Sequence, residues 1–335
     1  MILAGDVGGT KSNLALFAIE GGRFSPIVEQ TLPSHDYAGL EDLTREFLRQ
    51  VTSQSPSVPI DQISAVCFGV AGPVVGERCE TPNLPWTISV QALRQALRFQ
   101  AVTLINDLEA TGYGIPSLGR NEFVTLNEGS LSEKGNAALI AAGTGLGEAM
   151  LYWDRENFIP IASEGGHADF APRNALEIEM LRYLLDRLDR VSYERVLSGP
   201  GLFNIYSFLR DSGHGEEPAW LTEQLQHGDP SAAIGKAALA NQNELCVKAL
   251  DIFVSIYGAE AGNLALKVKA VGGVYIGGGI APKIIDKLRD GTFMKAFTDK
   301  GRLSPLLEAI PVRVILNPKT ALYGAARFAA LLHKE

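Results

Sequence analysis

The stretch GDVGGTKSNLAL, residues 5 to 16, combines a carboxylate, glycines and a hydroxyl group at the bend of an expected β-hairpin. Apolar residues 2–4 precede it and predict a buried strand, and an apolar return predicts a second strand. Glycines let backbone N–H groups approach an anion closely, and an aspartate beside a phosphate requires a divalent cation between them. We therefore expect a loop for a magnesium-bound nucleotide, although a plain glycine-rich turn has the same pattern. The expected ligands are Gly8, Gly9 and Thr10 for the phosphates and Asp6, through water, for the magnesium ion.

A second bend, AAGTGLGEAMLYW at residues 141 to 153, repeats this design. An apolar strand is expected over residues 137–142, and the bend itself contains Gly143, Thr144 and Gly145. Two such hairpins indicate a duplicated α/β unit that holds one nucleotide between its copies.

Spacing disfavours two common phosphate motifs. A P-loop needs Gly-Lys-Ser/Thr in succession, whereas Thr10 stands between Gly9 and Lys11. A dinucleotide fingerprint needs glycines that open a helix, whereas the second bend leads into a strand-like run. The nucleotide site is therefore expected to have a different architecture.

Composition and charge narrow the functional class. The 335 residues are 46% hydrophobic and 20% charged, enough for a substantial core in two domains. A net charge of −8 without a basic stripe argues against nucleic acid or a membrane surface as the partner. Three cysteines without C-x-x-C spacing predict neither disulfides nor structural zinc. The apolar run at 241–268 contains charged residues, so it predicts a core helix and not a membrane span. No secretory signal is seen, so a cytoplasmic location is expected.

Strands and helices alternate along the first third of the chain, the pattern of an α/β domain. Helices are expected at 37–52 and 89–98, and strands at 63–70 and 102–105. Asn106 and Asp107 follow the last of these strands, and ligands of α/β sheets gather at the carboxyl ends of strands. Asp107 could also simply cap the helix expected at 108–113.

Two later stretches supply more polar groups: SEGGHADFAP at 163–172 and YERVLSGPG at 193–201. In the first stretch Glu164 and His167 have ExxH spacing, which on a helix could bind iron, but the intervening Gly-Gly disfavours a helix. Carboxylates accept and imidazole donates hydrogen bonds, a combination that suits neighbouring hydroxyl groups. A packed core histidine and a surface glutamate are the simpler alternative. The expected polyol pocket consists of Asn106, Asp107, Glu164, His167 and Glu194.

Two further loops are candidates for ligand contact. Asn83, in the proline-rich loop 81–86, could line a polar cleft or only form a turn. Gly278 and Gly279 follow a strand expected at 274–276 and could let a base or ribose lie on the backbone, or allow close helix packing. The remaining elements expected are helices at 175–188, 201–211, 218–226 and 320–332 and a strand at 312–316.

Together these stretches resemble the bacterial glucokinase family, within the superfamily of hexokinase, actin and Hsp70-type ATPases. The resemblance rests on GDVGGTKSNLAL, INDLEATGYGIP, AAGTGLGEA, SEGGHADFAP, YERVLSGPGL and GGVYIGGGIAPK, in this order along nearly the whole chain. It implies an α/β fold of the ribonuclease H-like, actin-like ATPase type, with a cleft between two domains. The implied smaller domain is 1–107 with helix 319–335 packed back on it, and the larger domain is 108–318.

The resemblance also implies the reaction, ATP-dependent phosphorylation of the 6-hydroxyl of glucose, which is the first step of glycolysis. ATP and Mg²⁺ are the implied cofactors, and a homodimer is usual for the family. Asp107 is implied as the general base, and the nucleotide set gains Lys11. Lys11-Ser12 and Glu148 stand where the family often has Asn-Ala and a small apolar residue. The implied sugar ligands are Asn83, Asn106, Asp107, Glu164, His167 and Glu194.

Two alternatives belong to other classes. A non-enzymatic ATP-binding or filament protein of the actin and Hsp70 type would need the hairpins but not the polyol pocket. A kinase for another hexose would need both, since epimers are distinguished by small displacements of the same side chains.

Overall fold

The computed structural model describes residues 1–20, 23–81, 84–131 and 134–332. The chain forms two compact units: the first contains Met1–Arg120 and the segment that starts at Asn317, and the second contains Asn121–Leu316. A boundary after residue 107 was expected, whereas the helix that begins there is part of the first unit. Asn83 lies outside the described residues, so its role stays a prediction.

The first unit is built on a mixed five-stranded sheet in the order β3-β2-β1-β4-β8. β1 pairs antiparallel with β2 and parallel with β4, which in turn pairs parallel with β8. The carboxyl ends of β1, β4 and β8 therefore share one edge of the sheet. The strands are β1 Ile2–Val7, β2 Lys11–Glu20, β3 Arg23–Pro33, β4 Ala65–Val70 and β8 Val102–Asn106.

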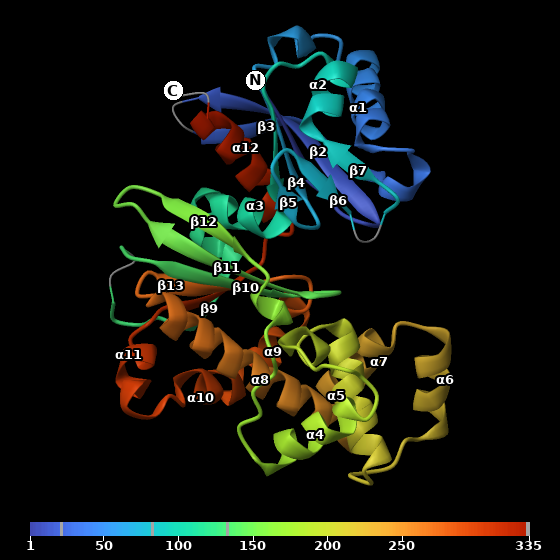
Figure 1. Cartoon of the computed structure of the whole chain (residues 1–335), viewed down its shortest axis with the longest axis vertical. Coiled ribbons are helices and arrows are strands. Elements are labelled where there is room, and N and C mark those ends of the chain that lie inside the picture. Colours follow the sequence, from blue (N-terminus) through green and yellow to red (C-terminus); the bar gives the residue numbers. More distant parts are fainter. Residues whose placement is uncertain (21–22, 82–83, 132–133, 333–335) are drawn as a thin grey trace. The chain divides into compact units, whose positions relative to one another are not determined.

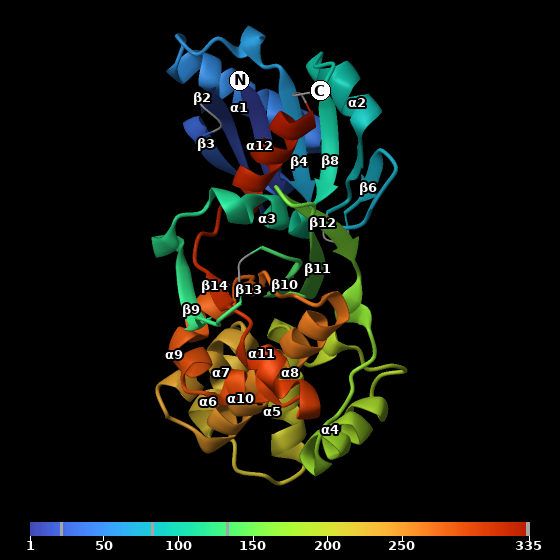
Figure 2. The same cartoon turned by 90° about the vertical axis from the view of Figure 1, so that its left-hand side faces the viewer.

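Helices cover both faces of this sheet (Figures 1 and 2). On one face, Leu3 and Val7 pack in a cluster with apolar residues of α1 (Leu40–Gln54) and α2 (Val90–Leu97). On the other face, Ile2 and Ala4 pack against α12 (Thr320–Leu332) and α3 (Asp107–Gly114). Strand side chains alternate between faces, so β1 reads as a continuous apolar run because both faces are covered. A small sheet of β5 Val74–Val75, β6 Arg78–Glu80 and β7 Thr87–Ser89 completes the unit.

The second unit repeats this topology. Its sheet has the order β12-β11-β10-β13-β14-β9. β10 pairs antiparallel with β11 and parallel with β13, as β1 does with β2 and β4. The duplicated unit inferred from the two hairpins is therefore present. The strands are β9 Phe123–Asn127, β10 Ala137–Ala142, β11 Leu146–Trp153, β12 Phe158–Ser163, β13 Gly273–Gly277 and β14 Val312–Ile315.

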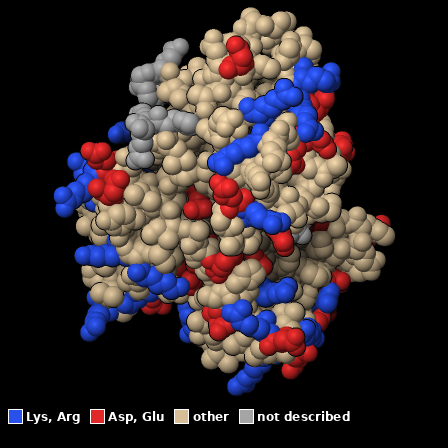
Figure 3. All heavy atoms as spheres, turned by 45° about the horizontal axis from the view of Figure 1, so that its top comes forward, with Lys and Arg blue, Asp and Glu red and all other residues tan. Residues whose placement is uncertain are grey.

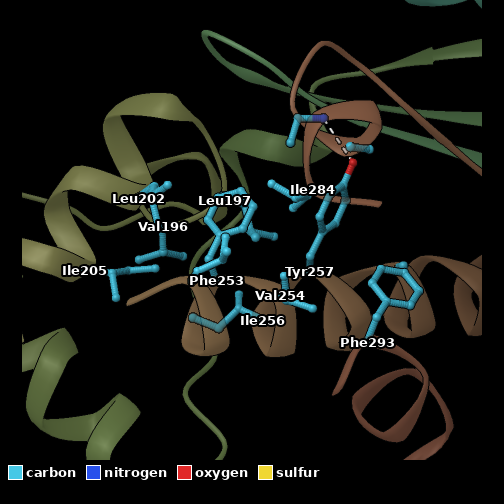
Figure 4. Packing of buried hydrophobic residues seen from close by; sticks show 14 of the residues in the cluster. Val196, Leu197, Leu202, Ile205, Phe253, Val254, Ile256, Tyr257, Ile284 and Phe293 are labelled. Atoms are coloured by element: carbon cyan, nitrogen blue, oxygen red, sulfur yellow. Dashed lines mark hydrogen bonds between the residues drawn. The ribbon is translucent and has the colours of Figure 1, made fainter. Parts of the chain in front are cut away.

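The helices of the second unit gather on one face of its sheet around the long helix α8, Glu244–Val268 (Figures 1 and 2). Phe253 and Tyr257 of α8 point into the apolar cluster between these helices and the sheet, and Ala142 N–H donates to the Tyr257 hydroxyl at 3.2 Å (Figure 4). This bond fixes the end of β10, where the second glycine bend begins. The other helices are α4 Ala175–Leu185, α5 Gly199–Asp211, α6 Ala219–His227, α7 Pro230–Leu239, α9 Ile285–Arg289, α10 Thr292–Thr298 and α11 Ser304–Glu308.

The surface carries charges of both signs. Figure 3 shows Lys and Arg interspersed with Asp and Glu on the face that it draws. Even α8, at 25 residues, contains several charged residues, and no helix in the described part of the chain could span a membrane.

Candidate active site

The first hairpin turns between β1 and β2 over residues 8 to 11, as expected from its glycines. Gly8 N–H donates to the Lys11 carbonyl at 3.2 Å and closes the turn. Thr10 and Lys11 are exposed at its tip, where donors to phosphate must stand. The geometry is therefore suited to backbone and side-chain contact with an anion.

Two serines support this turn from beneath. The Ser34 hydroxyl donates to the Gly8 carbonyl at 2.7 Å, and it lies 3.0 Å from the hydroxyl of buried Ser12. Ser34 N–H also donates to the Thr10 carbonyl at 3.0 Å. Ser34 thus makes two hydrogen bonds to the turn, and its hydroxyl is held in turn by that of Ser12.

Asp6 lies at the end of β1, opposite Asn13 of β2. The Asn13 amide donates to Asp6 Oδ2 at 3.2 Å, and Asn13 Oδ1 accepts from Thr31 at 2.8 Å. Burial raises the pKa of Asp6 above its ordinary value, and the bond from Asn13 and the charge of Lys11 oppose this rise. A cation near Asp6 would compensate for the lost hydration.

Asn106 and Asp107 stand at the same sheet edge, where β8 leads into α3. Asn106 is the N-cap of α3: its Oδ1 accepts from Leu108 N–H at 2.8 Å, and Glu109 accepts from Asn106 N–H at 3.0 Å. The Asn106 amide donates to the Gly72 carbonyl at 3.0 Å. Asp107 is the first helical residue, and its Oδ1 accepts from Leu108 N–H at 2.9 Å. The capping role considered for Asp107 therefore belongs to Asn106.

The second hairpin turns over residues 143 to 145 and is held by distant groups. Gly143 N–H donates to the Gly145 carbonyl at 2.8 Å, and the Gly143 carbonyl accepts from Gly199 N–H at 2.8 Å. Glu194 Oε2 accepts from Leu146 N–H at 2.9 Å. A predicted sugar ligand therefore holds the predicted phosphate loop.

The loop with Glu164 and His167 forms a single 3-10 turn over Gly165–His167. His167 Nε2 lies 3.9 Å from Glu194 Oε1, and both Glu164 and His167 are exposed. Gly166 is buried against the backbone of Leu146, where a Cβ would overlap the Leu146 carbonyl oxygen. The loop with Glu164 and His167 and the bend between β10 and β11 therefore pack directly on each other.

The third glycine turn lies against the same strand end. Gly278 has a φ of 83°, which favours glycine, and a Cβ there would overlap the Ala142 carbonyl. That carbonyl accepts from Ile280 N–H at 3.2 Å, and a Cβ on Gly279 would meet open space. β10 and β13 are parallel neighbours, so their glycine turns share one sheet edge.

The structure thus collects the predicted residues into two sets, one in each unit. Within the described residues, no cluster of three or more His, Cys, Asp or Glu side chains could hold a metal ion. The sequence interpretation missed the supporting residues Asn13 and Ser34, and it noted Ser12 and Glu148 only as departures from the family pattern. Period-2 alternation around Asp6 could have indicated Asn13 as its cross-strand neighbour. No local pattern indicates Ser34, which comes from beyond β3.

Comparison with known proteins gives one answer. A glucokinase family model matches residues 3–332. A glucokinase of Nostoc sp. is 44% identical over 346 residues, 99% of both chains. A glucokinase of Caulobacter vibrioides is 38% identical over 97% of this chain and 93% of its own.

Solved structures agree. The structure of a glucokinase from an Antarctic psychrotroph has a TM-score of 0.84 and 31% identity, covering 98% of each chain. A ROK family glucokinase from Streptomyces griseus, solved with glucose and AMPPNP, shares the fold with a TM-score of 0.64 at 21% identity, covering 98% of this chain and 99% of its own. The chain belongs to the glucokinase family.

Proposed function

We propose that this protein transfers the γ-phosphoryl group of ATP to the 6-hydroxyl of glucose, with Asp107 as the general base. The observation that carries the proposal is the full-length match to the glucokinase family, which covers both hairpins and the predicted sugar ligands. In this reaction a bond forms between the sugar oxygen and the γ-phosphorus while the bond to the bridging oxygen of ADP breaks. The hydroxyl proton passes to a carboxylate.

Asp107 suits the base because of its place at the carboxyl end of β8. Asn106 beside it is locked by the cap of α3 and by Gly72, so the two side chains have a fixed spacing. The amide of Asn106 can address a hydroxyl adjacent to the one that reacts. Glu164, His167, Glu194 and Asn83 complete the proposed sugar ligands.

The nucleotide is proposed to contact both hairpins and the third glycine turn. Backbone N–H groups and Thr10 and Thr144 supply neutral donors, and Lys11 supplies a positive charge. Gly279 leaves space for a base or ribose, because a Cβ there would have no neighbouring atoms, while Gly278 turns the chain against the Ala142 carbonyl. The proposed phosphate ligands are Gly8, Gly9, Thr10, Lys11, Gly143, Thr144 and Gly145.

Asp6 is the residue that would hold Mg²⁺, through water. Its pKa is raised by burial, so a nearby cation would stabilise its charged form. A single protein carboxylate is sufficient, since Mg²⁺ keeps several waters and binds substrate phosphates. The ion would neutralise charge on the phosphates as the transfer proceeds.

The two sets of residues lie in separate units of the chain. We propose that glucose and ATP bind residues of both, and that binding draws the units together, as in other enzymes that exclude water by hinge closure. X-ray scattering should then give a smaller radius of gyration with glucose than without it. An unchanged profile would contradict closure.

The Asp107→Asn variant tests the central step. The amide keeps the shape and one acceptor but cannot take the proton, so we expect kcat to fall at least about a hundredfold while glucose affinity changes much less. Glu109→Ala is the matched control, because it disturbs the cap of α3 without touching Asp107. If Asp107→Asn kept more than about a tenth of the turnover, the base would have to be another residue.

A further inference from the structure

Glu148 is a buried carboxyl group with no place in the reaction described above. It lies on β11, opposite Ile140 of β10 and Ser163 of β12. It is only 1% exposed, and its Oε1 has no hydrogen-bond partner among the residues that the structure describes. A buried polar atom without a partner costs free energy, so such an atom in a native protein calls for a functional explanation.

The second oxygen of Glu148, Oε2, packs against the loop that carries the proposed sugar ligands Glu164 and His167. Oε2 lies beside Gly165, the first residue of the turn that carries His167. A Cβ on Gly165 would overlap this oxygen. Gly165 N–H donates to Ser163 Oγ at 2.9 Å, which fixes the start of the turn. Gly166 rests on the Leu146 backbone. The turn therefore packs against the Glu148 carboxyl group and against β11, the strand that contains Glu148.

The charged groups that face Glu148 come mainly from α8. Glu260 is fully buried, and its Oε1 lies 3.2 Å from Lys267 Nζ. Burial first, and Glu260 second, raise the pKa of Glu148 to about 7, while Lys267 opposes the rise. Tyr257 of the same helix is also near enough for Glu148 to raise its pKa.

The loop side adds two further titratable groups. Glu164 and His167 flank the two glycines of the turn in sequence. Any change of charge on Glu148 therefore takes place behind the proposed sugar ligands, close to neutral pH.

We propose that Glu148 is a positioning residue for the sugar: its carboxyl group seats the Gly165–His167 turn and thereby sets where Glu164 and His167 stand. The inference rests on the proposed role of those two side chains as sugar ligands. In the neutral form the carboxyl group packs against Gly165 without a charge. Once ionised, it is a buried charge beside Glu260, which is stabilised only if the turn moves or water enters. Both responses displace the sugar ligands.

The first test compares Glu148→Gln with the natural protein across pH 6 to 8. Glutamine has the same shape and stays neutral, so its KM for glucose should match that of the natural protein at pH 6. The ratio of the natural KM to the variant KM should then rise with pH, with a midpoint near 7. In a Glu260→Gln background the midpoint should move to lower pH, because a charge that raises the pKa of Glu148 is gone. A flat ratio would overturn the proposal.

The second test measures the contact itself. Glu148→Ala should raise the KM for glucose about tenfold with a smaller change in kcat and in the KM for ATP, since the turn loses its seat. Gly165→Ala should also be harmful, because its Cβ overlaps the carboxyl group, and Glu148→Ala should relieve that harm by removing the overlapping atoms. Additive effects in this double-mutant cycle would contradict direct contact.

Two sets of controls separate the possible failures. Glu177→Gln removes the charge of another buried carboxylate, which pairs with Arg173 at 2.6 Å. This variant should lower stability without changing the KM for glucose. Glu164→Gln and His167→Ala are measured alongside. If these two raise the KM for glucose and the Glu148 variants do not, the inference alone is wrong. If they leave it unchanged, the proposed sugar site is wrong and the inference fails with it.

Discussion

The two glycine hairpins have the same topology but are supported in different ways. The β1–β2 turn is supported by groups close to it in sequence, Ser12 and Ser34, with Asn13 on the adjacent strand. The β10–β11 turn is held by Glu194 and Gly199, far along the chain. The first hairpin is therefore supported from β2 and from the residue that follows β3, whereas the second depends on the segment that leads into α5.

The hairpins also differ at their strand ends. Val7 and Ser12 form the last pair of the first hairpin, and Ala142 and Leu146 form the last pair of the second. One residue earlier, the first has Asp6 and the second has Ala141. Only the first thus has a carboxylate at this register, so the proposed cation would be held by one copy of the duplicated unit.

The largest predicted difference between the hairpins concerns a glycine beside each. In Gly166→Ala the new Cβ overlaps the backbone of Leu146, which cannot move aside, so we expect a loss of about 4 kcal/mol, above the roughly 1 to 3 kcal/mol usual for overpacking. In Gly8→Ala the nearest atom is the Lys11 carbonyl oxygen at 2.9 Å, a much smaller overlap, so we expect about 1 to 2 kcal/mol. Calorimetric unfolding of both variants checks this. Equal losses would show that the two loops are supported alike.

The next prediction uses the buried carboxyl group of the second hairpin. The folded pKa of Glu148, about 7, lies above the ordinary 4.5, so the folded state holds the proton more tightly than the unfolded chain. This contribution to stability is fully present below about pH 4.5, decreases as pH rises towards 7 and is then constant. It amounts to on the order of 3 kcal/mol, and Glu148→Gln should remove the slope. If the free energies of unfolding of the variant and the natural protein changed in parallel between pH 5 and 7, the raised pKa of Glu148 would be refuted.

A smaller effect is expected when the first hairpin loses its support. Ser34→Ala leaves the Gly8 carbonyl and the Ser12 hydroxyl without a partner, which costs about 1 to 2 kcal/mol. The KM for ATP should rise while the KM for glucose stays constant, because the affected turn carries the proposed phosphate ligands, whereas Asn106 and Asp107 follow β8, two strands away in the sheet. Steady-state kinetics with each substrate varied in turn distinguish these outcomes. A rise confined to glucose would reverse the assignment of the hairpin.

Long periodic elements were predicted well from the sequence. The strand at 137–142 and the helix at 320–332 have the bounds expected, and the long apolar run gave α8 with its start three residues later. These segments are apolar on all sides or on a continuous stripe, so pattern alone indicates them. The edge strand β3 was missed because Pro26 and polar residues such as Glu29 interrupt its alternation. The short helices α9 to α11 were missed because tertiary packing, rather than length or propensity, stabilises them.

The sequence indicates the residue types of the candidate site but not the contacts between them. Asn106 and Asp107 follow from their place after an apolar strand, yet which of them caps α3 depends on side-chain rotamers. The bond between Glu194 and Leu146 joins two loops distant in sequence, and no periodicity indicates it. In the sequence Glu148 is only a departure from the family pattern beside a glycine bend, whereas the structure shows that it is buried against Gly165.

The proposal that only the first hairpin holds the cation is tested most directly by titrating ATP into Asp6→Asn. The titration is done with magnesium and with a chelator, and the natural protein is titrated in the same way. If Asp6 serves the cation, the variant should bind ATP with magnesium about tenfold more weakly, while its affinity for metal-free ATP and for glucose stays within about twofold. Calorimetry gives all three affinities from one preparation. Equal weakening with and without magnesium, or a loss of glucose affinity instead, would contradict the account.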